Sequence, residues 1–136
     1  MRRSCWRGRI YFGSENGTVY ALSRPDIGSL IEVWPAHGFN CLRWRAGGRE
    51  LLYSAPDWAE NPVPTRSGVP ILFPFPNRIR DGRFAHGGRT FELTKNDSAR
   101  ANAIHGFAPR NPWRVFGYGA DVSSAWVHGD FHVPAD

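Results

Sequence analysis

The sequence predicts an all-β protein in which short antiparallel strands pack as a β-sandwich. No window of the 136 residues keeps apolar positions at helical spacing, and Gly or Pro interrupts nearly every apolar run. The 15 Gly and 11 Pro make the chain rich in turns, while nine Phe, six Trp and four Tyr supply residues that favour strands. A chain of this length can form one domain with its own core, which buries about two-thirds of the unfolded surface.

Three hairpins are expected because three pairs of strand-like runs each flank a turn that contains Gly. Asn16-Gly17 lies between the first pair and is the strongest short-range hairpin signal. Gly-Gly lies between the other two pairs. The paired runs are residues 8–12 with 18–22, 40–45 with 49–53, and 83–86 with 89–93, and single strands are expected at 30–33, 113–118 and 125–131.

Residues 54–77 differ from the rest of the chain, because six prolines rule out a regular central strand and imply an extended, rigid path. Long irregular segments inside compact domains are usually functional or disordered. This segment contains Val-Pro-Ile-Leu-Phe-Pro-Phe at residues 69–75, which is too apolar for disorder. We therefore expect it to be pinned against the core.

Charge and cysteine content exclude few classes of protein. Lys and Arg total 17 against 12 Asp and Glu, a formal net charge of +5. Arginine suits phosphate, carboxylate or sugar hydroxyls, but charge spread along the chain is only a weak indication of nucleic-acid binding. Cys5 and Cys41 form neither a disulfide framework nor a zinc signature. The basic start lacks the apolar run of a secretory signal, and no stretch approaches the ~20 apolar residues of a membrane span, so a cytoplasmic protein is expected.

Two polar clusters are candidates for chemistry. Asn77 and Arg78 directly follow the proline-rich segment, and a rigid loop that delivers an amide and a guanidinium to one place can orient a polar ligand. The alternative is that Arg78 merely pairs with a nearby carboxylate. His105 precedes Gly106, which would let a ligand or backbone approach the imidazole closely. The alternative there is a plain surface or capping histidine.

A third cluster is His128, Asp130 and His132, which strand alternation would place on one face. Two His and an Asp at this spacing could ligate a metal. No further cluster supplies the remaining ligands, so an exposed terminal strand is the preferred interpretation and no metal is expected.

Several motifs, in order and at compatible spacing, resemble the aldose 1-epimerase family. Residues 67–84 read Ser-Gly-Val-Pro-Ile-Leu-Phe-Pro-Phe-Pro-Asn-Arg-Ile-Arg-Asp-Gly-Arg-Phe, similar to the family's Gly-Pro-apolar-Pro stretch that leads into Asn-Arg-Ile and a hairpin. Residues 88–93 are similar to the family's Gly-x-x-Tyr-x-Leu. Asn102, His105-Gly106 and Trp113 then follow in the family's order, and the likeness covers residues 18–119.

The resemblance implies a β-sandwich of the galactose mutarotase-like type and an acid/base reaction without metal or cofactor. In that reaction the anomeric hydroxyl of an aldohexose loses its proton while the ring oxygen is protonated, and the opened sugar recloses as the other anomer. The resemblance implies that His105 is catalytic and binds substrate together with Arg78. It further implies that Asn77 supports this site and that Phe75 and Phe107 offer an apolar face to the sugar ring.

The chain also departs from the family's pattern. In the family the base is a Glu near the carboxyl end, and a second His and an Asp come from the later half of the domain. Residues 18–136 are therefore expected to be the amino-terminal part of such a domain, an incomplete sandwich with little or no activity alone. Unpaired strand edges would then favour self-association.

Residues 8–22 also resemble one blade repeat of a quinoprotein-type β-propeller. The repeat occurs once, and one blade cannot close a propeller. We therefore expect residues 1–17 to be an irregular extension and the domain's first strand to begin at Thr18.

Three functions follow from these features, in decreasing order of support. The first is an epimerase acting on an aldohexose, with the arginines leaving a phosphorylated sugar open. The second is a non-catalytic carbohydrate-binding module that retains Arg78 and His105. The third, a nucleic-acid-binding protein using Arg with Trp6, Trp44 and Trp113, has the least support, and we expect neither a nucleic-acid nor a membrane partner.

Overall fold

The computed structural model describes residues 7–11, 17–97 and 99–133, and these form only strands, turns and short 3₁₀ helices. Five strands make one antiparallel sheet in the order β1-β2-β3-β4-β5. Their bounds are β1 Arg7–Tyr11, β2 Val19–Arg24, β3 Ser29–Trp34, β4 Asn40–Ala46 and β5 Arg49–Glu50. The all-β prediction is therefore confirmed.

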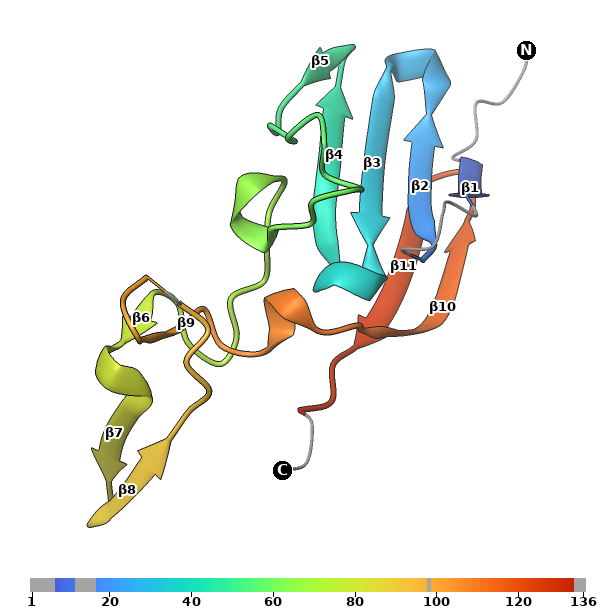
Figure 1. The fold of residues 1–136 in the computed structure, drawn as a ribbon. Coiled ribbons are helices and arrows are strands. Elements are labelled where there is room, and N and C mark those ends of the chain that lie inside the picture. The colour runs from blue at the N-terminus through green and yellow to red at the C-terminus, as the bar shows by residue number, and fades with distance from the viewer. Residues whose placement is uncertain (1–6, 12–16, 98, 134–136) are drawn as a thin grey trace.

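A second hairpin layer lies against one end of this sheet. β10 (Arg114–Ala120) pairs antiparallel with β11 (Ala125–Asp130), and both contact β1 and β2. The rings of Tyr20 on β2 and Tyr118 on β10 meet at 5.5 Å between centroids. Figure 1 shows this hairpin crossing beside β1 and β2. The two layers give the protein its sandwich-like packing.

Two smaller strand pairs project from the body of the protein (Figure 1). β7 (Arg83–His86) and β8 (Arg89–Glu92) form a hairpin across Gly87-Gly88, as the sequence predicts. β6 (Arg78–Ile79) pairs antiparallel with β9 (Ala103–Ile104), which lies more than twenty residues further along the chain. The chain enters β6 from the proline-rich segment and leaves β9 toward β10.

The core is centred on β2, β3 and β4. Its buried apolar residues are Ala21, Leu22, Val33, Trp34, Leu42, Ala55, Ala103 and Ala108. Trp34 is 2% exposed and its ring meets that of Trp58 edge-on, with 4.9 Å between centroids. This contact holds the start of the proline-rich segment against the sheet.

The proline-rich segment is pinned by its backbone, as expected, but several of its side chains face solvent. The N–H of Val69 donates to the carbonyl of Cys41 at 3.0 Å, and Gly68 N–H donates to Tyr53 O at 2.8 Å. Asn40, 4% exposed, donates from Nδ2 to Ser67 O at 2.9 Å. The apolar side chains Val69, Ile71 and Phe73 nevertheless remain exposed.

Two predicted boundaries are wrong. Residues 7–11 are not irregular: they form β1, which pairs residue for residue with β2 from Arg7–Ser23 to Tyr11–Val19, as the first predicted hairpin requires. The strand expected at residues 49–53 ends at Glu50, because the chain then turns toward the proline-rich segment. Residues 1–6 and 12–16, including Cys5 and Asn16, lie outside the described residues, and the division into an extension and a domain stays a prediction.

Apolar side chains are exposed on the β10–β11 hairpin. Phe116 is 63% exposed and Tyr118 is 53% exposed, and Trp126 is also exposed. Self-association through such surfaces stays a prediction. None of the helices in the described ranges is long and apolar enough to span a membrane.

Candidate functional site

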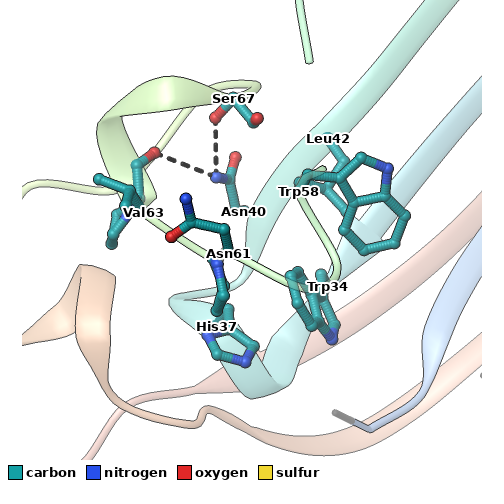
Figure 2. A pocket seen from close by; sticks show the side chains of 10 residues that line it. Trp34, His37, Asn40, Leu42, Trp58, Asn61, Val63 and Ser67 are labelled. Carbon is teal, nitrogen blue, oxygen red and sulfur yellow. Dashed lines mark hydrogen bonds between the residues drawn. The ribbon is translucent and has the colours of Figure 1, made fainter. Parts of the chain in front are cut away.

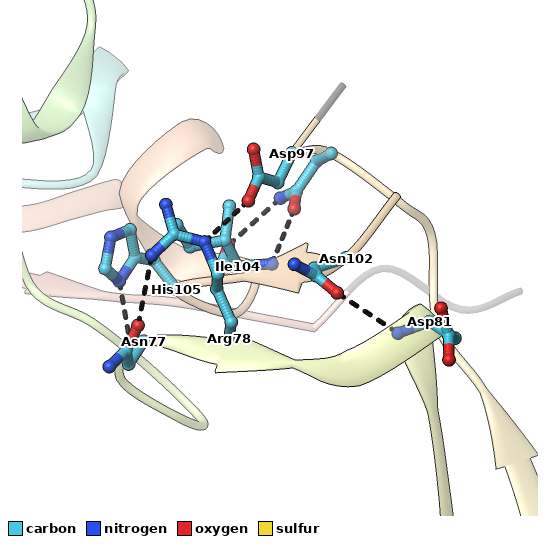
Figure 3. A network of polar contacts seen from close by, with 8 residues as sticks. Asn77, Arg78, Asp81, Asp97, Asn102, Ile104 and His105 are labelled. Carbon is cyan, nitrogen blue, oxygen red and sulfur yellow. Dashed lines mark hydrogen bonds and ion pairs between the residues drawn. The ribbon is translucent and has the colours of Figure 1, made fainter. Parts of the chain in front are cut away.

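The pairing of β6 with β9 brings the two predicted polar clusters together. Arg78 lies opposite Ile104 in the register, so that Asn77 and His105 meet at the end of the pair. The N–H of His105 donates to Asn77 O at 2.9 Å, and the N–H of Asn77 donates to Nδ1 of the His105 ring at 3.1 Å. Figure 3 shows the imidazole, the Asn77 amide and the Arg78 guanidinium grouped on one side of this short ladder.

The backbone at this junction adopts unusual conformations. Asn77 and His105 have φ values of 59° and 64°, in the left-handed region that residues with a side chain rarely adopt. Asparagine and histidine are among the residues that tolerate this region best. The reciprocal hydrogen bonds between the two residues offset part of the strain. The side chains of Asn77 and His105 therefore both lie at the same end of the β6–β9 strand pair.

Gly106 ties the histidine to the proline-rich segment. Its φ is 68°, and a Cβ atom there would lie 2.1 Å from the carbonyl oxygen of Phe73. The same oxygen accepts hydrogen bonds from the N–H groups of Phe107 at 2.8 Å and Ala108 at 3.1 Å. Only glycine permits this approach, so the residue after His105 is fixed by packing.

The Arg78 guanidinium is oriented by a carboxylate. Its Nε donates to Asp97 Oδ2 at 2.6 Å, and its Nη1 has a long 3.5 Å contact with Asn77 Oδ1. The alternative interpretation of Arg78, pairing with a carboxylate, is thus what the structure shows. The Arg78 side chain is 39% exposed and that of Asp97 is 13% exposed. Hydrogen bonding to Arg78 holds the pKa of the Asp97 carboxyl below its usual range. Nε is the guanidinium atom that contacts Asp97, while Nη1 lies on the side of Asn77.

His105 is held as a neutral hydrogen-bond donor. Because Nδ1 accepts the Asn77 N–H, the ring proton of the neutral form lies on Nε2. Desolvation lowers the pKa of His105, and the positive charges of Arg110 and Arg78 lower it further. The imidazole can therefore donate from Nε2 to a hydroxyl or ring oxygen at neutral pH.

Phe75 and Phe107 lie together, but in a neighbouring groove. Both line an apolar groove of about 360 Å³, whose other lining residues are Pro74, Ile79, Phe84 and Leu93. None of Asn77, Arg78 and His105 lines it. The structure thus brings Asn77, Arg78 and His105 into one cluster, and places the two phenylalanines in a separate apolar groove.

A second hollow lies on the sheet, between β4 and the proline-rich segment (Figure 2). Trp34, Trp58, His37 and Asn40 are among its lining residues, and its free volume is about 10 Å³. That is room for about one water molecule and not for a sugar. Burial lowers the pKa of His37. This hollow is therefore part of the packing of the core.

The histidines near the carboxyl end do not gather into a metal centre. Asp130 pairs with Arg114, and His132 Nε2 lies 3.5 Å from Asp130 Oδ1. The His128 ring instead stacks on Trp126, with 4.7 Å between centroids. Over residues 7–11, 17–97 and 99–133, no group of three or more His, Cys, Asp or Glu could hold a metal ion.

Asn96 and Asp97 are two site residues that the sequence interpretation missed. Asn96 Oδ1 accepts the N–H of Ile104 at 2.7 Å and its Nδ2 donates to Ile104 O at 3.1 Å, while Asp97 holds Arg78. The available signal was a polar run, Lys-Asn-Asp-Ser at residues 95–98, shortly before the His-Gly pair. Nothing in such a run says which backbone it faces, because that depends on the β6–β9 pairing.

Comparisons with known proteins agree with the motifs. The sequence model of the aldose 1-epimerase family matches residues 33–130. A galactose mutarotase-like protein from Clostridium acetobutylicum has a similar structure, with a TM-score of 0.71 and 28% identity over 90% of this chain. Two further structures share the fold: a protein from Synechocystis sp. PCC 6803 (TM-score 0.59, 24% identity, 88% of this chain) and galactose 1-epimerase from Lactobacillus acidophilus NCFM (0.58, 21%, 85%).

The matches cover 36%, 35% and 35% of those three chains, so this chain spans about a third of the length of the structures it resembles. The family resemblance inferred from the motifs is confirmed, and so is the galactose mutarotase-like type of the all-β fold.

Proposed function

The chain belongs to the aldose 1-epimerase family. We propose that Arg78 and His105 bind an aldohexose, the substrate whose α and β anomers enzymes of this family interconvert. The observation that carries this proposal is the β6–β9 pairing, which joins Asn77 and His105 by two reciprocal hydrogen bonds. Two polar side chains from distant parts of the sequence thereby face the same space. Such convergence is typical of sites that orient a polyhydroxylated ligand.

The geometry supports distinct roles for the two side chains. His105 presents an Nε2–H donor because its Nδ1 is already engaged, and this donor suits a hydrogen bond that orients and polarises a sugar oxygen without transferring the Nε2 proton. Arg78 presents its outer Nη groups, which suit hydroxyl oxygens. Asn77 acts through its backbone, by fixing the imidazole. Metal and cofactor have no part in this proposal.

The proposed general base is not among these residues. Asp97 is the carboxylate at the site, but its pKa is lowered by Arg78, which makes it a weak proton acceptor. The family resemblance assigns the base to a Glu of the later part of the domain. We therefore propose that this chain alone binds sugar and accelerates mutarotation little or not at all.

Phe75 and Phe107 are proposed as the apolar wall of the site. They lie two residues before Asn77 and two residues after His105, and they line the same groove. The apolar face of a pyranose packs favourably on aromatic rings. A sugar held by Arg78 and His105 could reach this groove with its ring face or its exocyclic carbon.

A phosphorylated hexose is a variant of the same proposal. Arg110 and Arg78 both act on the His105 ring electrostatically, so the surroundings of the site are positive. Guanidinium groups suit phosphate oxygens. Comparing glucose with glucose 6-phosphate in one titration separates the neutral from the phosphorylated substrate.

The test is calorimetric titration of the chain with galactose and glucose, together with polarimetry of anomer interconversion. Saturable binding is expected, and Arg78→Gln and His105→Ala should each weaken it by at least about tenfold, since each removes hydrogen bonds to a polar ligand. Arg66→Gln is the matched control, because Arg66 pairs with Asp57 as Arg78 pairs with Asp97. Binding that is equal in all four proteins, or no binding at all, would reject the proposed site. Binding without turnover is the expected behaviour of the wild-type chain.

A further inference from the structure

We propose that Asn96 and Asp97 are positioning residues, a two-residue clamp that sets the geometry of both Arg78 and His105. This inference rests on the proposed sugar site but assigns it two residues that are not among the motifs described above. The two side chains are adjacent in sequence and act on opposite strands of the β6–β9 pair. Asp97 thus contacts Arg78 itself, and Asn96 contacts Ile104, the residue before His105.

Asp97 fixes the guanidinium. The Arg78 Nε is 2.6 Å from Asp97 Oδ2, and Asp97 is the more buried partner of the pair, with 13% of its side chain exposed against 39% for Arg78. The N–H of Asp97 also donates to Asn102 O at 3.0 Å, so its own backbone is held. Asn102 Oδ1 in turn accepts the N–H of Asp81 at 3.2 Å. A carboxylate held at both backbone and side chain can hold an arginine in one orientation.

Asn96 fixes the strand that ends in the histidine. Its amide satisfies both backbone groups of Ile104, accepting from the N–H at 2.7 Å and donating to the carbonyl at 3.1 Å. It therefore takes the place of a neighbouring strand at the outer edge of β9. His105 follows directly in a left-handed conformation, which persists only where the surrounding structure determines it. Figure 3 shows Ile104 beside His105 on this strand.

The clamp should matter more for ligand geometry than for folding. A partly exposed ion pair adds little stability, so Asp97→Asn is expected to fold. Without its carboxylate partner, the Arg78 side chain is free to sample other rotamers and loses the preorganised position that binding requires. Asp97→Asn is therefore expected to weaken galactose binding by about tenfold, the loss typical of one charge-assisted hydrogen bond. Asp57→Asn, which removes the carboxylate paired with Arg66, should leave affinity unchanged.

A double-mutant cycle distinguishes positioning from general damage. If Asp97 acts only through Arg78, then Asp97→Asn costs nothing further once Arg78 is already Gln. The Arg78 Nε–H resonance gives a readout that needs no sugar: it should be shifted and slow to exchange in the wild type and in Asp57→Asn, and lost in Asp97→Asn. For Asn96→Ala, the two ring nitrogens of His105 should lose the distinct ¹⁵N shifts of a fixed Nε2–H tautomer. The control is Asn61→Ala, which removes an exposed amide that donates to Asp57 Oδ2 at 3.3 Å and should retain those shifts.

Additive losses in the cycle, or an unchanged Arg78 Nε–H resonance in Asp97→Asn, would overturn the role of Asp97. An unchanged His105 tautomer in Asn96→Ala would overturn the role of Asn96. If the wild-type chain binds no sugar, the proposed function fails on that result alone, and the two resonances still decide whether the clamp exists.

Discussion

Replacing Gly106 by alanine should test how tightly the site is tied to the proline-rich segment. The residue is buried, has a φ of 68°, and would place its Cβ 2.1 Å from Phe73 O, 2.4 Å from Phe73 C and 2.7 Å from Pro74 N. All three are backbone atoms and cannot rotate away. The Phe73 carbonyl would have to move, and it accepts the N–H groups of Phe107 and Ala108.

The cost has two parts. A residue with a Cβ in the left-handed region costs about 1–2 kcal/mol. Forcing a methyl group into packed backbone costs about 1–3 kcal/mol more, since the neighbours must shift. Together they predict a loss of about 2–5 kcal/mol in the free energy of unfolding.

The assay is urea unfolding followed by tryptophan fluorescence, with Gly88→Ala as the matched control. Gly88 has a φ of 72°, but its Cβ would meet nothing within 4 Å, so only the conformational cost of about 1–2 kcal/mol applies. Gly106→Ala should also shift the His105 ring resonances. Equal losses of stability in the two variants would refute the close approach, and with it the packing that fixes the histidine.

Three further outcomes are expected. Trp34→Ala should lower the free energy of unfolding by about 3–5 kcal/mol, because Trp34 is 2% exposed. Trp44→Ala should lower it by about 1 kcal/mol, because Trp44 is 46% exposed. Similar losses in the two variants would contradict the assigned core. The pKa of His105, read from its ring resonances, should lie below the ordinary value of about 6.5, so that the ring is neutral at pH 7. Since the folded state then binds fewer protons than the unfolded state, this residue's contribution to stability should be complete above about pH 6.5 and decline as the pH falls toward the folded pKa. Arg110→Gln should raise the pKa of His105, because it removes a neighbouring positive charge. An unchanged or lower pKa of His105 in that variant would show that the Arg110 charge does not act on the imidazole.

The fold was predictable where its signals are local. The Gly-Gly turns at residues 47–48 and 87–88 define hairpins whose two strands are adjacent in sequence, and both hairpins form. β10 and β11 likewise fall within runs that contain aromatic and β-branched residues and were expected as strands. In each case the information lies within about fifteen residues, so no long-range pairing has to be inferred.

The pairing of β6 with β9 was not predictable in this way. Each strand has two residues, too few for a period to be visible, and their partners lie about 25 residues apart in the chain. The motifs nevertheless indicated Arg78 and His105 as candidates, because they occur in the family's order. What the sequence could not supply was the second layer of contacts, Asp97 on Arg78 and Asn96 on Ile104, since these depend on the register of that pair.

The separation of the aromatic residues from the polar group has a similar origin. Phe75 and Phe107 flank the polar pair in sequence, which suggested one surface. In the structure they line a groove with Phe84 and Leu93 that none of Asn77, Arg78 and His105 lines, and contact of one sugar with both surfaces stays a prediction. The left-handed turns at Asn77 and His105 are set by tertiary contacts and are not evident in the residue pattern.

The most direct test of the central claim is an NMR titration of the isotope-labelled chain with galactose, following the Nε2–H of His105 and the guanidinium of Arg78. The account predicts that both resonances shift together along one saturable curve, while those of His37, in the hollow on the sheet, and of Arg66 stay in place. Shifts at other residues with these two unchanged, or no shift anywhere at saturating sugar, would contradict it.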